Sequence, residues 1–497
     1  MSAYGELEAR YRRIDALGGA LSVLSWDQAT MMPAGGAEAR AEQMATLSVI
    51  RHSMLTDPML GDLMSAAEDA DIADPWQAAN LREMRRAWRH ANALDSRMVD
   101  ARARASSACE MRWRTARADK DFAGLLPSLE VLLELTRETA AAKAEAFGCS
   151  PYDALLDEYE PGGRAEAIDV LFAELAASLP TILSEAVRAQ AARGRPSLPA
   201  GPFPVAAQRA LGVRLMEALG FDFRHGRLDV SLHPFTGGVP DDVRITTRYT
   251  EADFTRALMG VLHETGHALY ERGLPAAWRG QPVGEARGMT AHESQSLLIE
   301  MQVCRGREFL GYLAPLLREA FGGVGPSWRE ESLARVFTKV EPGLIRVDAD
   351  EVTYPLHVIL RYRIERQLLS GELALADLPE AWRRAMRDLL GVDVPDDRDG
   401  CLQDIHWPSG SFGYFPTYTL GAMAAAQLFA AACGQDAAIK PGIAKGDFAP
   451  LLAWLKTKVH GRGSLDPSTD AMLVHATGKP LGVAAFEAHL TERYLAA

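Results

Sequence analysis

The stretch His263-Glu264-Thr265-Gly266-His267 dominates the interpretation of this chain, because it places two histidines four residues apart. On an α-helix, residues at that spacing share one face, and two imidazoles on one face can bind a single zinc ion. The flanking residues 254–262 and 268–272 contain no proline and predict a continuous helix. Glu264 would then lie beside the ion, where it can accept a proton from water and pass it to a leaving amine. Two ordinary core histidines would give the same pattern, so the motif needs support from elsewhere in the chain.

A hydrolytic zinc site needs a third protein ligand and one open position. Glu293 is our candidate, because the segment Gly288 to Val303 predicts a second helix. The glycines and prolines of residues 273–288 allow that helix to fold back on the first one. Thr290 is the expected N-cap, which leaves open that Glu293 only completes a capping box with it. Glu300, two turns later on nearly the same face, is the alternative ligand.

Zinc-binding histidines usually donate their second ring nitrogen to a carboxylate or a carbonyl group. One turn after Glu293 the chain has Ser296 and Leu297, and neither is a carboxylate. We therefore expect the acceptor further along the chain, at Asp348 or Asp350.

Six segments, in this order, resemble signatures of the zinc metallocarboxypeptidase family typified by carboxypeptidase Taq. They are His233–Phe235, Asp242–Thr246, His263–His267, His292–Ser296, Ile345–Asp350 and Gly400–Trp407. The segments Leu24–Gln28 and Tyr152–Gly162 agree with the family as well, so the resemblance covers nearly the whole chain.

The resemblance implies a mainly α, zincin-like fold with a deep active-site cleft. We expect a single metallocarboxypeptidase domain over residues 1–497, with a helical amino-terminal lobe, 1–204, followed by a zinc- and substrate-binding lobe, 205–497. The resemblance also implies one Zn²⁺ per chain, for which another divalent metal such as Co²⁺ can substitute, and a homodimer.

Release of a carboxyl-terminal residue requires a cation that receives the terminal carboxylate, and the fork of an arginine suits this geometry. Arg346 is the first candidate, and in the family this motif's arginine resembles a substrate-binding residue. From the sequence alone, Arg346 could instead pair with Asp350 on a helix surface. Arg244, on a predicted strand, is the second candidate, and His233 is a further substrate contact by resemblance.

Peptide hydrolysis places negative charge on the former carbonyl oxygen, where a phenol or an imidazole can donate a hydrogen bond. The chain carries His406 and, in a glycine-containing loop before an apolar helix, Tyr414 and Tyr418. By resemblance to related zinc peptidases, Tyr418 is the expected oxyanion donor, while Tyr414 and His406 are expected to contact the substrate. The sequence leaves the choice between the two tyrosines open.

Most of the chain predicts helix, since apolar residues recur at three- and four-residue spacing over 7–17, 76–109, 128–147, 165–179, 205–219 and 327–340. Two stretches alternate as strands do, Arg227–Leu232 and Asp242–Tyr249, with the turn residues Phe235–Pro240 between them. They predict a small antiparallel hairpin beside the zinc helix. Its open edge can pair with an extended peptide, or the hairpin only closes the core.

The composition excludes some partners. With 53 basic and 66 acidic residues the net charge is −13, which argues against binding to nucleic acid. The five cysteines are scattered, as is typical of reduced thiols. Met1–Glu8 has no basic start, and the longest mainly apolar run, Thr419–Cys433, is shorter than the roughly 20 residues of a membrane span. We therefore expect a cytoplasmic protein without a nucleic-acid or membrane partner.

These features predict a zinc carboxypeptidase of broad specificity that releases single carboxyl-terminal residues from peptides. The alternatives are a zinc endopeptidase of oligopeptides, an aminopeptidase, and a zinc-stabilised peptide-binding protein without catalysis. Gly421–Ala424 lacks the asparagine of a Gly-x-Met-x-Asn element, which argues against the aminopeptidase. A structural zinc site has no use for Glu264 or for an open coordination position, which argues against the binding protein.

Overall fold

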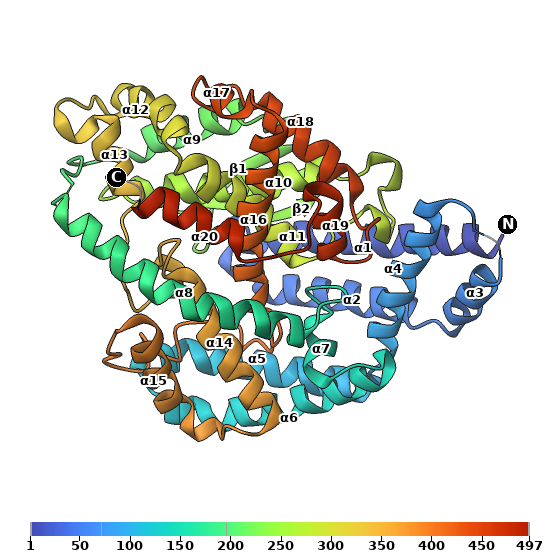
Figure 1. Cartoon of the computed structure of the whole chain (residues 1–497). Helices are drawn as coiled ribbons and strands as arrows, with labels where there is room; N and C mark the ends of the chain where they lie inside the picture. Colours follow the sequence, from blue (N-terminus) through green and yellow to red (C-terminus); the bar gives the residue numbers. More distant parts are fainter. Residues whose placement is uncertain (1, 71, 195, 496–497) are drawn as a thin grey trace. The chain divides into compact units, whose positions relative to one another are not determined.

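The computed structural model describes residues 2–70, 72–194 and 196–495, and over these ranges the chain is mainly helical (Figure 1). Its contacts divide it into two units of three segments each. Unit 1 is Met1–Ala91, Pro196–Thr338 and Gly421–Leu481, and unit 2 is Asn92–Arg195, Lys339–Leu420 and Gly482–Ala497. The mainly α prediction is confirmed. The units differ from the two successive lobes expected on either side of residue 204, because the chain returns to each unit more than once.

Unit 1 contains the predicted zinc helix, α10 (Thr255–Gly273), which packs against a small sheet and against α9 (Val205–Ala218). Its other helices are α1 (Ala3–Thr30), α2 (Ala37–Leu55), α3 (Pro58–Glu68), α4 (Pro75–Asn92), α11 (Met289–Leu297), α12 (Arg307–Phe321), α13 (Glu330–Phe337), α17 (Ile439–Ile443), α18 (Ala449–Lys458) and α19 (Thr469–Thr477). The helix α16 (Pro416–Gln435) begins in unit 2 and continues in unit 1.

The sheet has three strands, β1 (Gly226–Val230), β2 (Phe235–Val239) and β3 (Asp242–Thr247), in the order β1-β3-β2. This corrects the predicted hairpin, because β1 pairs with β3 in parallel and the antiparallel partner of β3 is β2. The two glycines of β2 made its sequence resemble a turn. The real turn is only Pro240-Asp241, since Val239 already pairs with Asp242.

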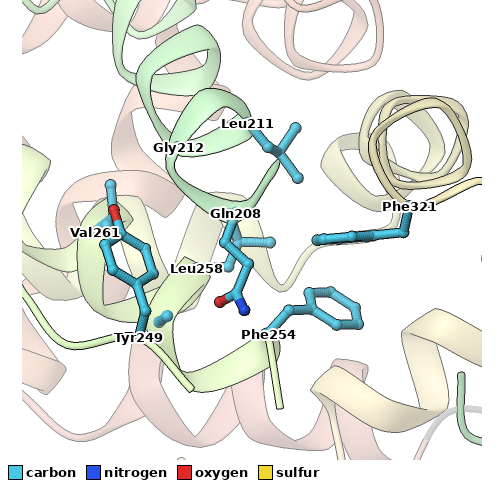
Figure 2. Close-up of a pocket in the computed structure, with 9 residues that line it drawn as sticks. Gln208, Leu211, Gly212, Tyr249, Phe254, Leu258, Val261 and Phe321 are labelled. Carbon is cyan, nitrogen blue, oxygen red and sulfur yellow. The ribbon is translucent and has the colours of Figure 1, made fainter. Parts of the chain in front are cut away.

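Apolar side chains from the sheet, α9 and α10 form one core cluster of unit 1, which includes Met216, Val243, Ile245 and Val261. Behind α10 this core leaves a cavity of only about 10 Å³, lined by α9, α12 and the start of α10 (Figure 2). That volume is about the size of one water. This side of α10 is therefore packed against the core and has no room for a ligand. The other side carries His263 and His267.

The second predicted helix begins two residues earlier than expected and ends differently. Its N-cap is Gly288 rather than Thr290, so Thr290 lies in the first turn and forms no capping box with Glu293. The helix α11 continues directly into a π-helix, Leu298–Cys304. Such wide turns are rare and occur frequently at functional sites.

Unit 2 is helical. Its helices are α5 (Ser96–Asp119), α6 (Phe122–Phe147), α7 (Pro151–Leu156), α8 (Ala165–Ala192), α14 (Tyr354–Ser370), α15 (Leu378–Leu390) and α20 (Ala484–Leu490). The predicted helix 76–109 is in fact two helices, α4 and α5. The chain breaks between them because Asp95 accepts a hydrogen bond from the backbone N–H of Met98 and caps the new helix.

Among the described residues α8 is the one helix long and apolar enough to span a membrane, judged by length and composition alone. Its buried residues, such as Ile168, Phe172, Leu175 and Leu179, recur every three or four positions. This is the pattern of a helix packed on one side, and α8 contacts α14 and α15 within unit 2.

Candidate active site

Two imidazoles and one carboxylate converge in unit 1. The side chains of His263 and His267 share one face of α10, and Glu293 faces them from α11. The Nε2 atoms of His263 and His267 lie 4.0 and 3.5 Å from Oε2 of Glu293. Ligands about 2.0 Å from a tetrahedral ion are roughly 3.3 Å apart. The three side chains thus fit a divalent metal ion with little movement.

The other ring nitrogens of the two histidines are anchored. Nδ1 of His267 lies 3.1 Å from the backbone carbonyl oxygen of His292, and Nδ1 of His263 lies 3.0 Å from Oε2 of Glu300. Both histidines therefore direct Nε2 towards Glu293, as metal-binding histidines do. This corrects our expectation that Asp348 or Asp350 accepts a hydrogen bond from a metal-binding histidine. Glu300, which we considered as an alternative metal ligand, is instead the residue that orients His263.

The turns after Glu293 explain why Glu300 reaches His263. Glu300 lies in the π-helix, where its second oxygen accepts a hydrogen bond of 2.6 Å from Arg305. Arg305 also donates to the carbonyl oxygen of Phe337. The hydrogen bonds from Arg305 to Glu300 and between Glu300 and His263 thus fix the orientation of one candidate metal ligand on the side away from the metal position.

The charges of this cluster are unbalanced. With the histidines neutral, Glu264, Glu293 and Glu300 contribute −3 and Arg305 contributes +1, which leaves −2. Without a metal ion, His263 takes up a proton instead: burial lowers its pKa, but the hydrogen bond to Glu300 and the charges of Glu293 and Glu264 outweigh it and raise the pKa to about 10. The site therefore attracts positive charge at the position where the ligand atoms converge.

Two glycines let the backbones around Glu293 approach closely. A Cβ on Gly266 would lie 2.5 Å from the carbonyl oxygen of Gln295 on α11. A Cβ on Gly421 of α16 would lie 2.8 Å from both Cβ and Cγ of Glu293. A side chain at either position would displace the candidate ligand, so these contacts fix its place.

Glu264 is buried and has a hydrogen-bond donor of its own. The hydroxyl of Thr236, on β2, donates to Oε2 of Glu264 over 2.6 Å. The bond leaves Oε1 of Glu264 for another partner. Thr236 was not a candidate in our sequence interpretation, because we assigned its segment to a turn.

The strand β2 lies at the edge of the sheet, with β3 on one side only. Both the N–H and the carbonyl oxygen of Gly238 bond to the hydroxyl of Ser22 on α1, so these groups point away from β3. Backbone groups two residues apart in a strand point the same way. In a regular strand the N–H and carbonyl of Thr236 would point to the same side as those of Gly238, next to Glu264.

Unit 2 holds a second buried cluster of charges, around Asp404. Arg346 donates to Oδ1 of Asp404 over 2.9 Å, and Arg361 donates to Oδ2 over 2.6 Å. The pair that the sequence allowed, between Arg346 and Asp350, is not formed, since Asp350 instead accepts backbone N–H groups. Burial alone would raise the pKa of Asp404, but the two guanidiniums hold it far below its usual range.

Two arginines and one aspartate leave this cluster with a charge of +1. Each nitrogen of the Arg361 guanidinium makes a hydrogen bond: Nε donates to Asp404, Nη1 to the carbonyl oxygen of His357 and Nη2 to the side chain of Gln403. Within the described residues, Nη1 of Arg346 has no hydrogen-bond partner. Arg346 therefore carries the unbalanced charge and a free donor.

The expected oxyanion residues surround Arg346. The ring of Tyr418 lies 4.6 Å from its guanidinium carbon, and the hydroxyl of Tyr418 lies 3.1 Å from Nε2 of His406. Burial and the charge of Arg346 lower the pKa of His406 to about 3, so this ring is neutral. Tyr414 packs against both rings, at 5.5 Å from His406 and 5.1 Å from Tyr418. The structure thus brings Arg346, His406, Tyr414 and Tyr418 together.

Two candidates stand apart from these clusters. Arg244 pairs with Asp242 over 2.7 Å and lies 4.3 Å from the ring of Trp26, so its guanidinium is already used within the sheet and α1. His233 is exposed in the loop before β2. Neither has a contact with His263, His267 or Glu293 in the described part of the chain.

Comparisons with known proteins agree along the whole length. The family model described as carboxypeptidase Taq (M32) metallopeptidase matches residues 6–494. A thermostable carboxypeptidase 1 from Thermus thermophilus is 42% identical over 100% of this chain and 99% of its own length. Among solved structures, Trypanosoma cruzi metallocarboxypeptidase 1 has a TM-score of 0.97 at 43% identity, over 99% of each chain. An M32 carboxypeptidase from Deinococcus radiodurans has a TM-score of 0.93 at 36% identity, over 99% of this chain and 100% of its own.

Proposed function

The chain belongs to the carboxypeptidase Taq (M32) metallopeptidase family and is a metallocarboxypeptidase, and we propose that it uses zinc to release single residues of many kinds from the carboxyl ends of peptides. The observation that carries the proposal is the convergence of His263, His267 and Glu293 around one point, with Glu264 beside them on the same helix. The full-length similarity to carboxypeptidases favours this function over the endopeptidase, the aminopeptidase and the binding protein without catalysis.

Two imidazoles and one carboxylate are a ligand set typical of catalytic zinc with an open fourth position, and Co²⁺ can occupy such a site. When bound, the ion supplies Lewis-acid chemistry to the scissile carbonyl and makes water more acidic. We assign one ion per chain to His263, His267 and Glu293. Glu300 and the carbonyl of His292 support the proposal, because they fix which ring nitrogens are left for the ion.

Glu264 is our candidate for the group that moves the proton. Its carboxylate accepts the proton of the attacking water and then delivers it to the leaving amine. Thr236 supports this role by holding Oε2, which leaves Oε1 to receive the proton.

In this proposal Arg346 binds the terminal carboxylate of the peptide. The charge of +1 in its cluster suits a single carboxylate, and the stacking on Tyr418 holds the guanidinium in place. Tyr418 donates to the oxygen that becomes negative, provided that Nε2–H of neutral His406 donates to the phenol oxygen. Tyr414 contacts the substrate beside them, whereas the occupied side chain of Arg244 makes it the weaker candidate for the carboxylate.

We also propose that the peptide pairs with the edge of β2 at Thr236. The outward direction of the backbone groups there, beside Glu264, supports strand addition of the kind used by other peptide-binding proteins. His233 lies in the exposed loop just before β2. In this proposal it contacts the peptide near the start of that strand.

A cytoplasmic location and a homodimer remain proposals from the sequence. All five cysteines are free thiols, which suits a reducing compartment. The homodimer is proposed on the basis of the family resemblance, and sedimentation can measure it.

One peptide in two forms tests the function. We expect the amino-blocked peptide with a free carboxyl end to lose residues one at a time, as followed by mass spectrometry, and its carboxyl-amidated twin to stay intact. A chelator should abolish the release and Zn²⁺ should restore it. Cleavage inside the amidated peptide would instead favour the endopeptidase.

A further inference from the structure

Unit 1 contains a cavity of about 1040 Å³ to which none of the proposed roles has been assigned. It is lined by α1, by the turn between β2 and β3, by the end of α10 and by the loop that leads to α11. Cavities of this volume are at the upper end of those that hold small ligands. Its walls mix apolar side chains such as Val23, Leu55 and Leu274 with charged ones.

Three of its lining segments continue from the candidate metal site. Glu271 follows His267 by four residues and so lies one turn further along the same face of α10. His292 immediately precedes Glu293 and bonds to Glu271 over 2.9 Å. The residues Gly238–Asp241, which line the cavity, follow Thr236 in the chain by two to five residues. A peptide held at Thr236 therefore lies close to the cavity, and it must leave the strand at Gly238, where Ser22 occupies the backbone groups.

The lining carries charges of both signs. Its acidic residues are Asp15, Glu83, Asp241, Glu271 and Glu285, and its arginines are Arg51, Arg86 and Arg279. Most of the acidic residues have partners.

Glu83 pairs with Arg287 over 2.8 Å, and Asp241 pairs with Arg272 over 2.6 Å. By contrast, no ion pair or hydrogen bond of the Asp15 or Glu285 carboxylate occurs among the residues that the structure describes.

The two unpaired carboxylates lie close enough to affect each other. Both side chains are exposed to the cavity, and partial desolvation by its walls together with the charge of Asp15 raises the pKa of Glu285 to about 7, against the opposing charges of Arg51 and Arg86. Desolvation raises the pKa of Asp15 as well, although Arg51 and Arg279 partly offset it. A cation that enters the cavity would relieve this repulsion.

We propose that this cavity receives the peptide residues that precede the cleaved bond and that Asp15 and Glu285 select lysine and arginine among them. The inference rests on the proposed function, since an enzyme that removes one terminal residue must accommodate all other residues on one side of the bond. The cavity supplies room for several of them, and the two carboxylates without an ion pair supply the preference.

The test is a set of amino-blocked hexapeptides with identical last two residues and Lys-Lys, Ala-Ala or Glu-Glu at the two positions before them. We expect kcat/KM for release of the last residue to fall in that order, by roughly fivefold or more from each peptide to the next at low salt. The differences should shrink as the salt concentration rises, because salt screens such interactions. Rates that agree within twofold across the three peptides would overturn the inference.

Two double variants with the same change of charge locate the effect. Asp15→Asn with Glu285→Gln should bring the Lys-Lys to Glu-Glu ratio close to one. Glu38→Gln with Asp62→Asn, on the exposed parts of α2 and α3, should keep it. A ratio that persists in the first variant would overturn the assignment to this cavity.

Should that double variant fail to fold, Glu285→Gln alone and the salt dependence of the unmodified enzyme decide the same question. Release of no residue from any of the peptides is a different result. It would overturn the proposed function and the inference with it.

Discussion

The cluster around His263 in unit 1 and the cluster around Asp404 in unit 2 are both largely buried, but they carry opposite net charges. Three carboxylates and one arginine give the first cluster −2, whereas two arginines and one carboxylate give the second +1. Buried charges are normally paired, so each imbalance indicates a missing partner. The first fits a divalent cation, and the second fits one carboxylate.

The two clusters also differ in how they are assembled. In unit 1 the two histidines and Glu264 belong to five consecutive residues, and only Glu293 and Glu300 come from further along. In unit 2 the ion pairs join residues 43 and 58 positions apart. A cluster of the first kind can be found in a sequence by its spacing, while a cluster of the second kind becomes visible only after folding.

The largest expected effect separates binding of the ion from movement of the proton within the negative cluster. Glu264→Gln should lower kcat by roughly 10³-fold, because the ligands remain and only the proton acceptor is lost. Metal content, measured together with turnover, should stay at one ion per chain. Activity within tenfold of the unmodified enzyme would remove Glu264 from its role.

A second change breaks the positive cluster. Asp404→Asn should lower the free energy of unfolding by about 3–5 kcal/mol at pH 7, because two buried guanidiniums lose their shared counter-charge. The folded pKa of Asp404 is depressed, so its stabilisation is present above the unfolded pKa of about 3.9 and is lost as the pH falls below it. Urea titrations should therefore show the two proteins converging below about pH 4. A constant difference over this range would contradict the pairing.

A third change tests the partner of the positive cluster. Arg346→Ala should reduce kcat/KM on a peptide with a free carboxyl end by about 2–4 kcal/mol of transition-state stabilisation. The amidated peptide should be unaffected, so the discrimination between the two forms disappears.

Arg244→Ala is the control for Arg346→Ala, because Arg244 is held by Asp242 and Trp26. It should keep the discrimination between the free and the amidated peptide. The opposite ranking would transfer the carboxylate site to β3.

A fourth change sharpens the description of the negative cluster. Glu300→Ala should weaken metal binding roughly 10- to 100-fold, as expected for a residue that orients a ligand, and Glu293→Ala should weaken it more. Competition with a chelator separates the cases, and equal affinities of Glu300→Ala and the unmodified protein would show that His263 needs no support.

The smallest effect concerns the space around Glu293. Gly421→Ala should weaken metal binding by about tenfold or less, because the new methyl group displaces Glu293 but a carboxylate can partly adapt. Gly434→Ala, on the same helix and with nothing within 4 Å, should leave the affinity unchanged. Identical chelator curves for the two variants would mean that the close approach at Gly421 has no function.

The sequence predicted the parts of the site that depend on local spacing. His263, His267 and Glu293 converge because α10 and α11 follow from ordinary helix periodicity. The place of Glu300 did not follow, because a π-helix changes the turn geometry without a clear signal in composition. Arg361 and Asp404 were missed since each looks unremarkable in its own segment. Thr236 was missed because two glycines made β2 resemble a turn.

The contact between Ser22 and Gly238 has a consequence for solubility. An open sheet edge is a template on which other chains, including copies of the same protein, can add strands and aggregate. An enzyme that pairs with peptides through an edge cannot remove that hazard entirely. Here the Ser22 hydroxyl of α1 occupies both backbone groups of Gly238, so another chain cannot pair with β2 at that residue. A continuous ladder along the whole of β2 is therefore blocked.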